Sequence, residues 1–406
     1  MGWVRCASSA KLLLIACLSV PVVAHAEWAV TGSVGETVEA NNNVQVESDS
    51  PGGAVGLITS LSLQAINEWP TLRWAIGTSL DFSKYWGPGA NDSLDGLHGG
   101  VLTTTLDKAA PLTDYHAAFS ATVLPASLSE VLDSGVTNAN TTTFTYSGQG
   151  SLTHQVNGLN AIGLSASARS QSFSNDGAPN STTNNVLTPN TYLTAGQSWI
   201  HNVNPRTNLT LGASTGWYLA DGVGSTDSVS ESVTLSVQTA LSERLNFTAG
   251  GGGNVVCTTG DTYETNSGFI ANVALAYELA TTTFSAFASH NLAPSSLGQI
   301  QESTQAGFSV AHAINEWSGV VFSGAFVFQL PVVSLRADSN RDQQHQALVL
   351  SAGYNRVLAE NWNLGLRYAF TQQNNSDDGF IRDLNEGSSM SNAVFATITR
   401  NFNLLP

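Results

Sequence analysis

Charged residues are scarce in this sequence. Only 11% of its residues are charged, where about 25% is usual for a soluble protein. Lysine and arginine together number 14 against 30 aspartates and glutamates, so the formal net charge is −16. Nucleic-acid binding needs clustered Lys and Arg. The composition therefore argues against nucleic acid as a partner.

Cysteine is nearly absent as well, with three residues in the chain. Cys6 and Cys17 lie in an N-terminal segment that we expect to be removed, which leaves Cys257 alone. One cysteine excludes an intramolecular disulfide and a cysteine-based zinc site. We expect Cys257 to be structural rather than a nucleophile.

The first 26 residues have the pattern of a secretory signal peptide. Arg5 and Lys11 give a basic start, residues 12–23 are mostly apolar, and small residues precede a cleavage site after Ala26. Removing these two basic residues takes the net charge from −16 to −18. An alternative is a lipobox ending at Cys17, but the apolar stretch before Cys17 is very short and continues beyond it.

Long hydrophobic runs are missing after residue 26, so the sequence offers no membrane-spanning helix. Instead, apolar and polar residues alternate. From Leu72 to Phe82 the even positions are mostly apolar and the odd positions are polar or small. A strand sends successive side chains to opposite faces. Stretches 209–217, 233–238 and 364–371 alternate in the same way. A soluble sandwich would also alternate, but several runs reach about ten residues, the length that a tilted strand needs to cross a bilayer.

The connections also alternate, between short and long. The sequence Ala-Ile-Asn-Glu-Trp at 65–69 recurs at 313–317, and variants of this short turn follow at similar intervals. Eight such turns alternate with nine longer connections rich in Gly, Asn and Asp, the asymmetry of outer-membrane barrels. We therefore expect residues 27–406 to form one all-β domain, an antiparallel up-and-down transmembrane β-barrel of about 18 strands. One misjudged hairpin would make 16.

The strand parity divides the residues between lipid and lumen. Trp74, Leu211 and Leu366 fall on the apolar face. On the opposite face, the candidate lumen-facing charges are Arg73, Asp81, Arg169 and Arg367. A charged side chain has a high free energy in lipid, whereas a water-filled lumen tolerates it. These four residues could form a weak selectivity filter, or they could form salt bridges across the lumen. The sequence leaves both interpretations open.

The final strand, 392–402, carries alternating residues on one face: Val394, Ala396, Ile398 and Phe402. It resembles the C-terminal strand of outer-membrane proteins, which the barrel assembly machinery recognises, although Arg400 interrupts the apolar face. With the hairpin rhythm, the segment 35–43 and the turn 204–207, the mature chain resembles the β-barrel porins of proteobacteria. Several of those families are associated with exopolysaccharide and exosortase systems. The resemblance implies outer-membrane lipid, lipopolysaccharide and the assembly machinery as partners, with polysaccharide or export components as further candidates.

Motifs for chemistry are lacking. Gly250 to Gly253 could suggest a phosphate loop, but no Gly-Lys-Ser/Thr follows and the stretch lies on an expected strand. Asp377 and Asp378 could suggest calcium, but spaced carboxylates are missing and a solvated loop is the simpler interpretation. We expect no catalysis, cofactor or metal. Two functions remain: a channel for small solutes or saccharides, or a non-conducting component of a surface polysaccharide or envelope assembly.

Overall fold

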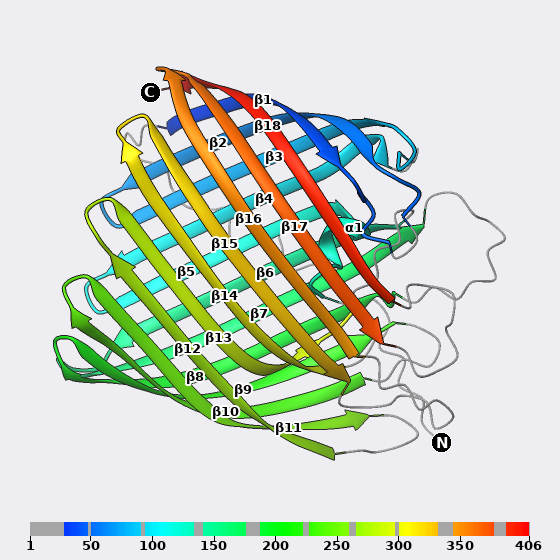
Figure 1. The fold of residues 1–406 in the computed structure, drawn as a ribbon. Coiled ribbons are helices and arrows are strands. Elements are labelled where there is room, and N and C mark those ends of the chain that lie inside the picture. Colours follow the sequence, from blue (N-terminus) through cyan, green and yellow to red (C-terminus); the bar gives the residue numbers. More distant parts are fainter. Residues whose placement is uncertain are drawn as a thin grey trace.

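The computed structural model describes residues 28–47, 50–90, 94–133, 141–175, 187–221, 227–259, 265–296, 300–331, 344–376 and 387–405. In this part the chain forms a closed barrel of long strands (Figure 1). The signal peptide predicted for residues 1–26 lies outside the described residues. The strands are β1 (Trp28–Asn41), β2 (Ala54–Trp69), β3 (Leu72–Trp86), β4 (Gly96–Ala110), β5 (Thr113–Pro125), β6 (Thr141–Gln155), β7 (Asn160–Asn175), β8 (Asn190–Asn204), β9 (Thr207–Ala220), β10 (Asp227–Ser242), β11 (Leu245–Thr259), β12 (Thr265–Glu278), β13 (Thr282–Pro294), β14 (Ile300–Asn315), β15 (Ser318–Pro331), β16 (Gln344–Ala359), β17 (Trp362–Ser376) and β18 (Gly387–Leu405).

The barrel is a single 18-stranded sheet in which chain neighbours pair antiparallel. β1 pairs with β2 on one side and with β18 on the other, where Val38 lies opposite Ala396. This pairing closes the ring, so no strand edge is left unpaired, as a bilayer requires. The prediction of an 18-stranded up-and-down barrel is confirmed, and the alternative of 16 strands is wrong.

The outer face of the barrel is apolar. In β3, Leu80 and Phe82 are 40% and 42% exposed, whereas the inward Ser83 and Tyr85 are 7% and 4% exposed. Apolar side chains stay exposed on the outer face around the ring, among them Leu211, Leu235, Phe269, Phe322 and Leu366. With strands of 13 to 19 residues, this is the architecture of an integral outer-membrane β-barrel. Among the described residues, no helix is both long and apolar enough to cross a bilayer.

Trp74 shows how a polar group on the outer face can be satisfied locally. Trp74 packs edge-on against Trp28 with 5.4 Å between the ring centroids, and its Nε1–H donates to Thr104 Oγ1 over 2.9 Å. A bonded indole N–H can enter an apolar surface without the cost of an unpaired donor. The structure thus shows how an amphipathic residue such as Trp74 is accommodated on the outer wall.

Short turns join the strands at one end of the barrel and longer connections at the other (Figure 1). Asn204 and Asn315 each accept a backbone N–H from two residues on, at 2.8 and 2.9 Å, as Asx turns do. The two Ala-Ile-Asn-Glu-Trp repeats differ, however. Residues 313–317 contain their turn, whereas 65–69 continue β2 and the chain turns at Pro70 and Thr71. Pro70 sets the turn dihedral and thereby moves the reversal along the chain.

The last strand, β18, is longer than the expected 392–402. Val394, Ala396 and Ile398 alternate on its outer face, and Val394 and Ile398 are 55% and 41% exposed. Arg400 interrupts this face, as the sequence indicates, but its guanidinium lies 5.5 Å from the Trp362 ring and 5.0 Å from the Phe402 ring. These cation–π contacts stabilise the Arg400 charge on the outer face, near the turn end of the barrel.

The four consecutive glycines, Gly250 to Gly253, lie within β11. A Cβ on Gly252 would come within 2.0 Å of the carbonyl oxygen of Val233 on β10. Glycine is therefore needed here for close backbone approach, which removes the basis for a phosphate-loop interpretation.

Candidate solute passage

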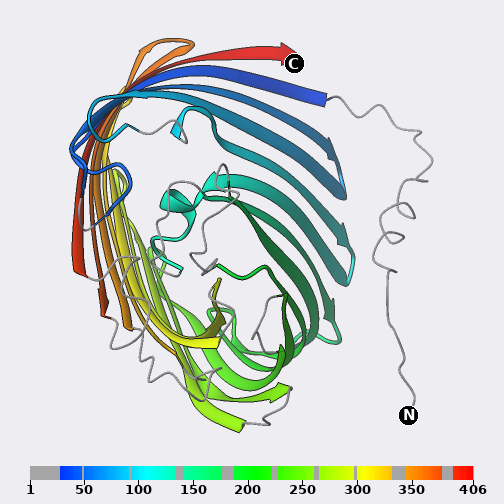
Figure 2. The same cartoon turned by 90° about the vertical axis from the view of Figure 1, so that its right-hand side faces the viewer.

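The connection after β5 folds into the barrel. After β5 ends at Pro125, the chain forms a short helix, α1 (Ala126–Ser129), and continues inside the ring (Figure 2). Residues 126–133 are called the inward segment below. Ala126 and Glu130 have no exposed surface, and Val131 is 7% exposed. The segment is therefore packed into the interior at the loop end of the barrel.

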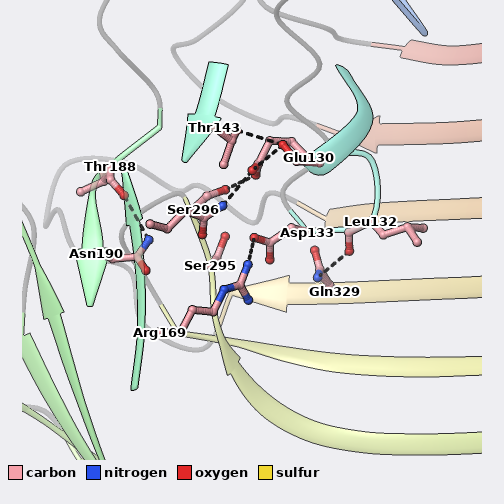
Figure 3. A network of polar contacts seen from close by, with 12 residues as sticks. Glu130, Leu132, Asp133, Thr143, Arg169, Thr188, Asn190, Ser295, Ser296 and Gln329 are labelled. Atoms are coloured by element: carbon pink, nitrogen blue, oxygen red, sulfur yellow. Dashed lines mark hydrogen bonds and ion pairs between the residues drawn. The ribbon is translucent and has the colours of Figure 1, made fainter. Parts of the chain in front are cut away.

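Glu130 anchors the inward segment to two distant parts of the chain (Figure 3). One carboxylate oxygen accepts from Gln171 Nε2 on β7 at 3.0 Å, and the other accepts from Ser296 Oγ at 2.5 Å. Ser129 Oγ adds a donor at 3.3 Å and also bonds Thr143 Oγ1 on β6 at 2.9 Å. A buried carboxylate needs such donors, and charge-assisted bonds are the strong ones.

The connection between β13 and β14 is also tied inward. The backbone oxygen of Ser295 accepts from the Tyr218 hydroxyl at 3.0 Å, and that of Ser296 accepts from the Thr188 N–H at 2.7 Å. Thr188 in turn accepts from Asn190 Nδ2 on β8 at 3.1 Å. Ser296 is thus held by a backbone hydrogen bond as well as by its bond to Glu130.

On the opposite wall, side-chain donors hold the backbone of the inward segment. Gln329 Nε2 on β15 donates to the Leu132 carbonyl at 3.3 Å, and His345 Nε2 on β16 donates to the Val131 carbonyl at 2.8 Å. The connection after β1 is held in the same way, because Gln373 Nε2 on β17 donates to the Val46 carbonyl at 3.1 Å. The inward segment therefore spans the lumen from β6 and β7 to β15 and β16.

A second charge pair lies beside this anchor. Arg169 on β7 approaches Asp133, with 4.0 Å between Nη2 and Oδ2. Burial and, to a lesser extent, the nearby charge of Glu130 raise the pKa of Asp133 to about 7, against the opposing effect of Arg169. Asp133 therefore takes up a proton more readily than an ordinary carboxyl group.

Beside the inward segment, the lumen contains a cavity of about 660 Å³, which is called the passage below. Its wall comes from β1, β2, β3, β4, β16, β17 and β18, and its other side from Leu128, Val131 and Leu132 of the inward segment. The charged residues that line it are Glu39, Asp81 and Arg367. This volume is in the range of small-molecule sites, about 300–1,000 Å³, so a small solute fits.

The wall of the passage contains one row of residues at the same height. Arg367 lies opposite Phe395, which lies opposite Glu39, and Glu39 lies opposite Gly56. A Cβ on Gly56 would come within 2.4 Å of the Tyr85 ring. The missing side chain lets Tyr85 cross β2 and donate its hydroxyl to Glu39 Oε2 at 2.7 Å. Gly56 therefore makes room for the bond that fixes Glu39.

The four candidate lumen-facing charges lie at three different places in the structure. Asp81 and Arg367 line the passage. Arg169 pairs with Asp133 of the inward segment. Arg73 lies at the turn end, where its Nε donates to Glu68 at 3.0 Å, and both side chains are well exposed, so the pair contributes little to stability. The four residues do not form one ring.

The residues that hold the inward segment were not singled out from the sequence. They are Glu130, Gln171, Ser296, Gln329 and His345, and Gln373, which holds the connection after β1, was not singled out either. One signal was present: Gln171, Gln329 and Gln373 stand near the loop ends of their strands, where an amide can serve a folded-in connection. Asp377 and Asp378 lie outside the described residues. Within the described part, no group of three or more His, Cys, Asp or Glu could hold a metal.

No protein-family model matches the chain, and no curated protein matches it. Solved structures are distantly similar to it. OccK2 (OpdF) of Pseudomonas aeruginosa, crystallised with glucuronate, is 11% identical over 93% of this chain and 98% of that chain, with a TM-score of 0.47. The FrpB iron transporter of Neisseria meningitidis is 8% identical over 93% and 82%, with a TM-score of 0.48. The siderophore receptor PirA of Pseudomonas aeruginosa is 10% identical over 92% and 80%, with a TM-score of 0.43. At such low identity, the likeness concerns the barrel fold alone.

Proposed function

We propose that the protein is a porin-like channel for passive diffusion of small solutes across the outer membrane of a Gram-negative bacterium. The observation that carries the proposal is the passage of about 660 Å³ beside the inward segment. The inward segment narrows the lumen without lying against the wall formed by β1 to β4.

The polar wall of the passage supports the same function. Thr37, Ser60 and Thr397 line it together with the charged groups. Hydroxyl and carboxylate groups can replace part of the hydration shell of a polar solute as it passes. The inward segment sets the width of the passage, because hydrogen bonds hold this segment to the barrel wall on both sides of the lumen. We therefore expect passage to be limited by size first and by charge second.

The proposal is tested by swelling of proteoliposomes in neutral polar solutes of graded size. We expect fast influx of the smallest solutes and a steep fall as the solute outgrows the passage. A matched variant in which residues 126–133 are replaced by a short Gly-Ser linker should shift the cutoff to larger solutes. No influx of any solute through the wild-type protein, with influx through the linker variant, would show that the native lumen is closed.

The second candidate, a non-conducting component of a surface polysaccharide or envelope assembly, rests on the resemblance alone. The same resemblance is the basis for proposing polysaccharide or export-system partners. It is also the basis for proposing contacts with lipopolysaccharide and the assembly machinery. Deletion of the protein should separate the two functions. Loss of polymer secretion without a change in permeability would favour the assembly component over the channel.

A further inference from the structure

The outer face of the barrel carries a row of basic and histidine side chains close to the turns. Strand parity puts them on the same face as exposed apolar residues. Arg400, for example, lies opposite Trp362, which is 38% exposed. The row consists of Lys108 on β4, His154 on β6, His201 on β8, His312 on β14, Arg356 on β16 and Arg400 on β18, and is called the basic rim below. Each lies near the turn end of its strand (Figure 1).

No carboxylate of the described strands accompanies the basic rim on this part of the outer face. The strand carboxylates nearest the turns have the opposite parity and belong to the lumen face; they are Glu68, Asp107, Asp114 and Glu278. Three further glutamates, Glu243, Glu316 and Glu360, belong to the turns themselves. None of Lys108, Arg356 and Arg400 takes part in an ion pair with a described residue. Their positive charges are therefore available to an anion from outside the barrel.

Aromatic side chains mark the depth of the basic rim in the membrane. The Arg400 guanidinium lies 5.5 Å from the Trp362 ring. His201 stacks on Trp199 with 5.4 Å between the ring centroids. Tryptophan is enriched at the level of the lipid headgroups, and the short turns of outer-membrane barrels face the periplasm. The basic rim therefore lies at the headgroups of the periplasmic leaflet, which consists of phospholipids.

Farther from the turns, the outer face has a different charge. Glu231 on β10 shares its face with Val233, which is 56% exposed. Lys84, near the loop end of β3, is paired with Asp95. An anionic headgroup therefore meets unpaired positive charge at the basic rim and not at these two places.

Two histidines of the basic rim can donate to an anion even when they are neutral. Nδ1 of His154 lies 2.8 Å from Thr113 Oγ1, and Nδ1 of His312 lies 2.8 Å from Thr282 Oγ1. When the threonine hydroxyl donates to Nδ1, the hydrogen of a neutral imidazole is on Nε2. Both histidines are exposed, so this N–H can reach a phosphate oxygen of a lipid.

We propose that the basic rim binds anionic phospholipids of the periplasmic leaflet through their phosphate groups. Lys108, Arg356 and Arg400 supply the charge, and the histidines supply further N–H donors. Guanidinium N–H groups match the geometry of phosphate oxygens, and a lysine ammonium binds phosphate as a point charge. Lipid binding on the outer face is independent of conduction through the lumen.

Native mass spectrometry of the folded barrel measures this lipid preference. The protein in detergent is titrated with an equimolar mixture of phosphatidylglycerol, which is anionic, and phosphatidylcholine, which has no net charge, both with the same acyl chains. We expect bound phosphatidylglycerol to exceed bound phosphatidylcholine at least about threefold, because each Lys or Arg at a membrane surface favours anionic lipid. Equal binding of the two lipids would overturn the proposal.

Substitutions assign the preference to the basic rim. The combined change Lys108→Gln, Arg356→Gln and Arg400→Gln should bring the ratio of the two bound lipids close to one. Two matched controls should keep the wild-type ratio. Arg73→Gln removes a cation at the same end of the barrel but on the lumen face, and Lys84→Gln removes one from the outer face near the loop end.

Heat-modifiable gel migration shows which preparations are folded. If the triple variant does not fold, the three single variants take its place, and each should lower the ratio in its folded fraction. A folded triple variant, or a full set of folded single variants, that keeps the wild-type ratio would contradict the proposal. So would Arg73→Gln or Lys84→Gln if either lowered the ratio as much as Arg356→Gln, because the preference would then follow the total charge of the protein and not the basic rim.

Discussion

The substitution Glu130→Ala should release the inward segment from the wall of the barrel. The Glu130 side chain is fully buried and accepts hydrogen bonds from Gln171 and Ser296. Without the carboxylate, both donors lose their partner, at about 1–3 kcal/mol each. Even the lower bound, about 2 kcal/mol in total, shifts the ratio of docked to released segment roughly 30-fold.

Single-channel recording measures this release directly. We expect Glu130→Ala to increase the mean conductance and the current noise, because the segment that narrows the lumen spends more time away from β7. Glu130→Gln keeps the volume and one acceptor oxygen, so it should lie between Glu130→Ala and the wild type. If Glu130→Ala channels, shown to be folded by heat-modifiable gel migration, conduct like the wild type, Glu130 does not hold the constriction.

Three further predictions concern other parts of the barrel. The pKa of Asp133 is raised to about 7 in the docked segment, whereas the released segment would lose this proton near pH 4. Protonation therefore favours docking, which is strongest in acid and weakens as the pH rises through about 7. Conductance should accordingly be higher at pH 8 than at pH 5, and Asp133→Asn should flatten that dependence. Gly56→Ala places a Cβ 2.4 Å from the Tyr85 ring and should change the conductance more than Tyr85→Phe, which removes only the hydroxyl. Leu235→Arg on the lipid face should destabilise the barrel folded in vesicles by about 2–4 kcal/mol, whereas Thr234→Arg on the lumen face should change its stability little. Urea titration measures both stabilities.

The strands were predictable because their information is local. In β3 the alternation from Leu72 to Phe82 fixes which side chain meets lipid, since a strand has a period of two. Counting short turns and long connections then gives the strand number, because each hairpin is a feature of a few adjacent residues. Local patterns have a limit, seen at 65–69, where the repeated motif did not turn and Pro70 shifted the reversal.

The inward segment was not predictable in the same way. Its sequence suggested an ordinary long connection, and nothing within residues 126–133 states that they fold into the lumen. That outcome depends on partners far along the chain: Ser296 is 166 residues from Glu130, and His345 is 214 residues from Val131. Parity placed Asp81 and Arg367 on the inner wall. It could not show that Arg169 would instead serve the inward segment.

The most direct test of the account is to block the passage itself. Asp81→Cys in a Cys257→Ser background of residues 27–406, which lack Cys6 and Cys17, places a single thiol in the passage, and a bulky maleimide is added during single-channel recording. The account predicts that labelling removes most of the current, while the same reagent at Asp114→Cys, in a separate hollow at the turn end, removes little. Labelling at Asp81→Cys that is complete by mass spectrometry and leaves the current unchanged would show that ions do not cross the barrel between the inward segment and β3.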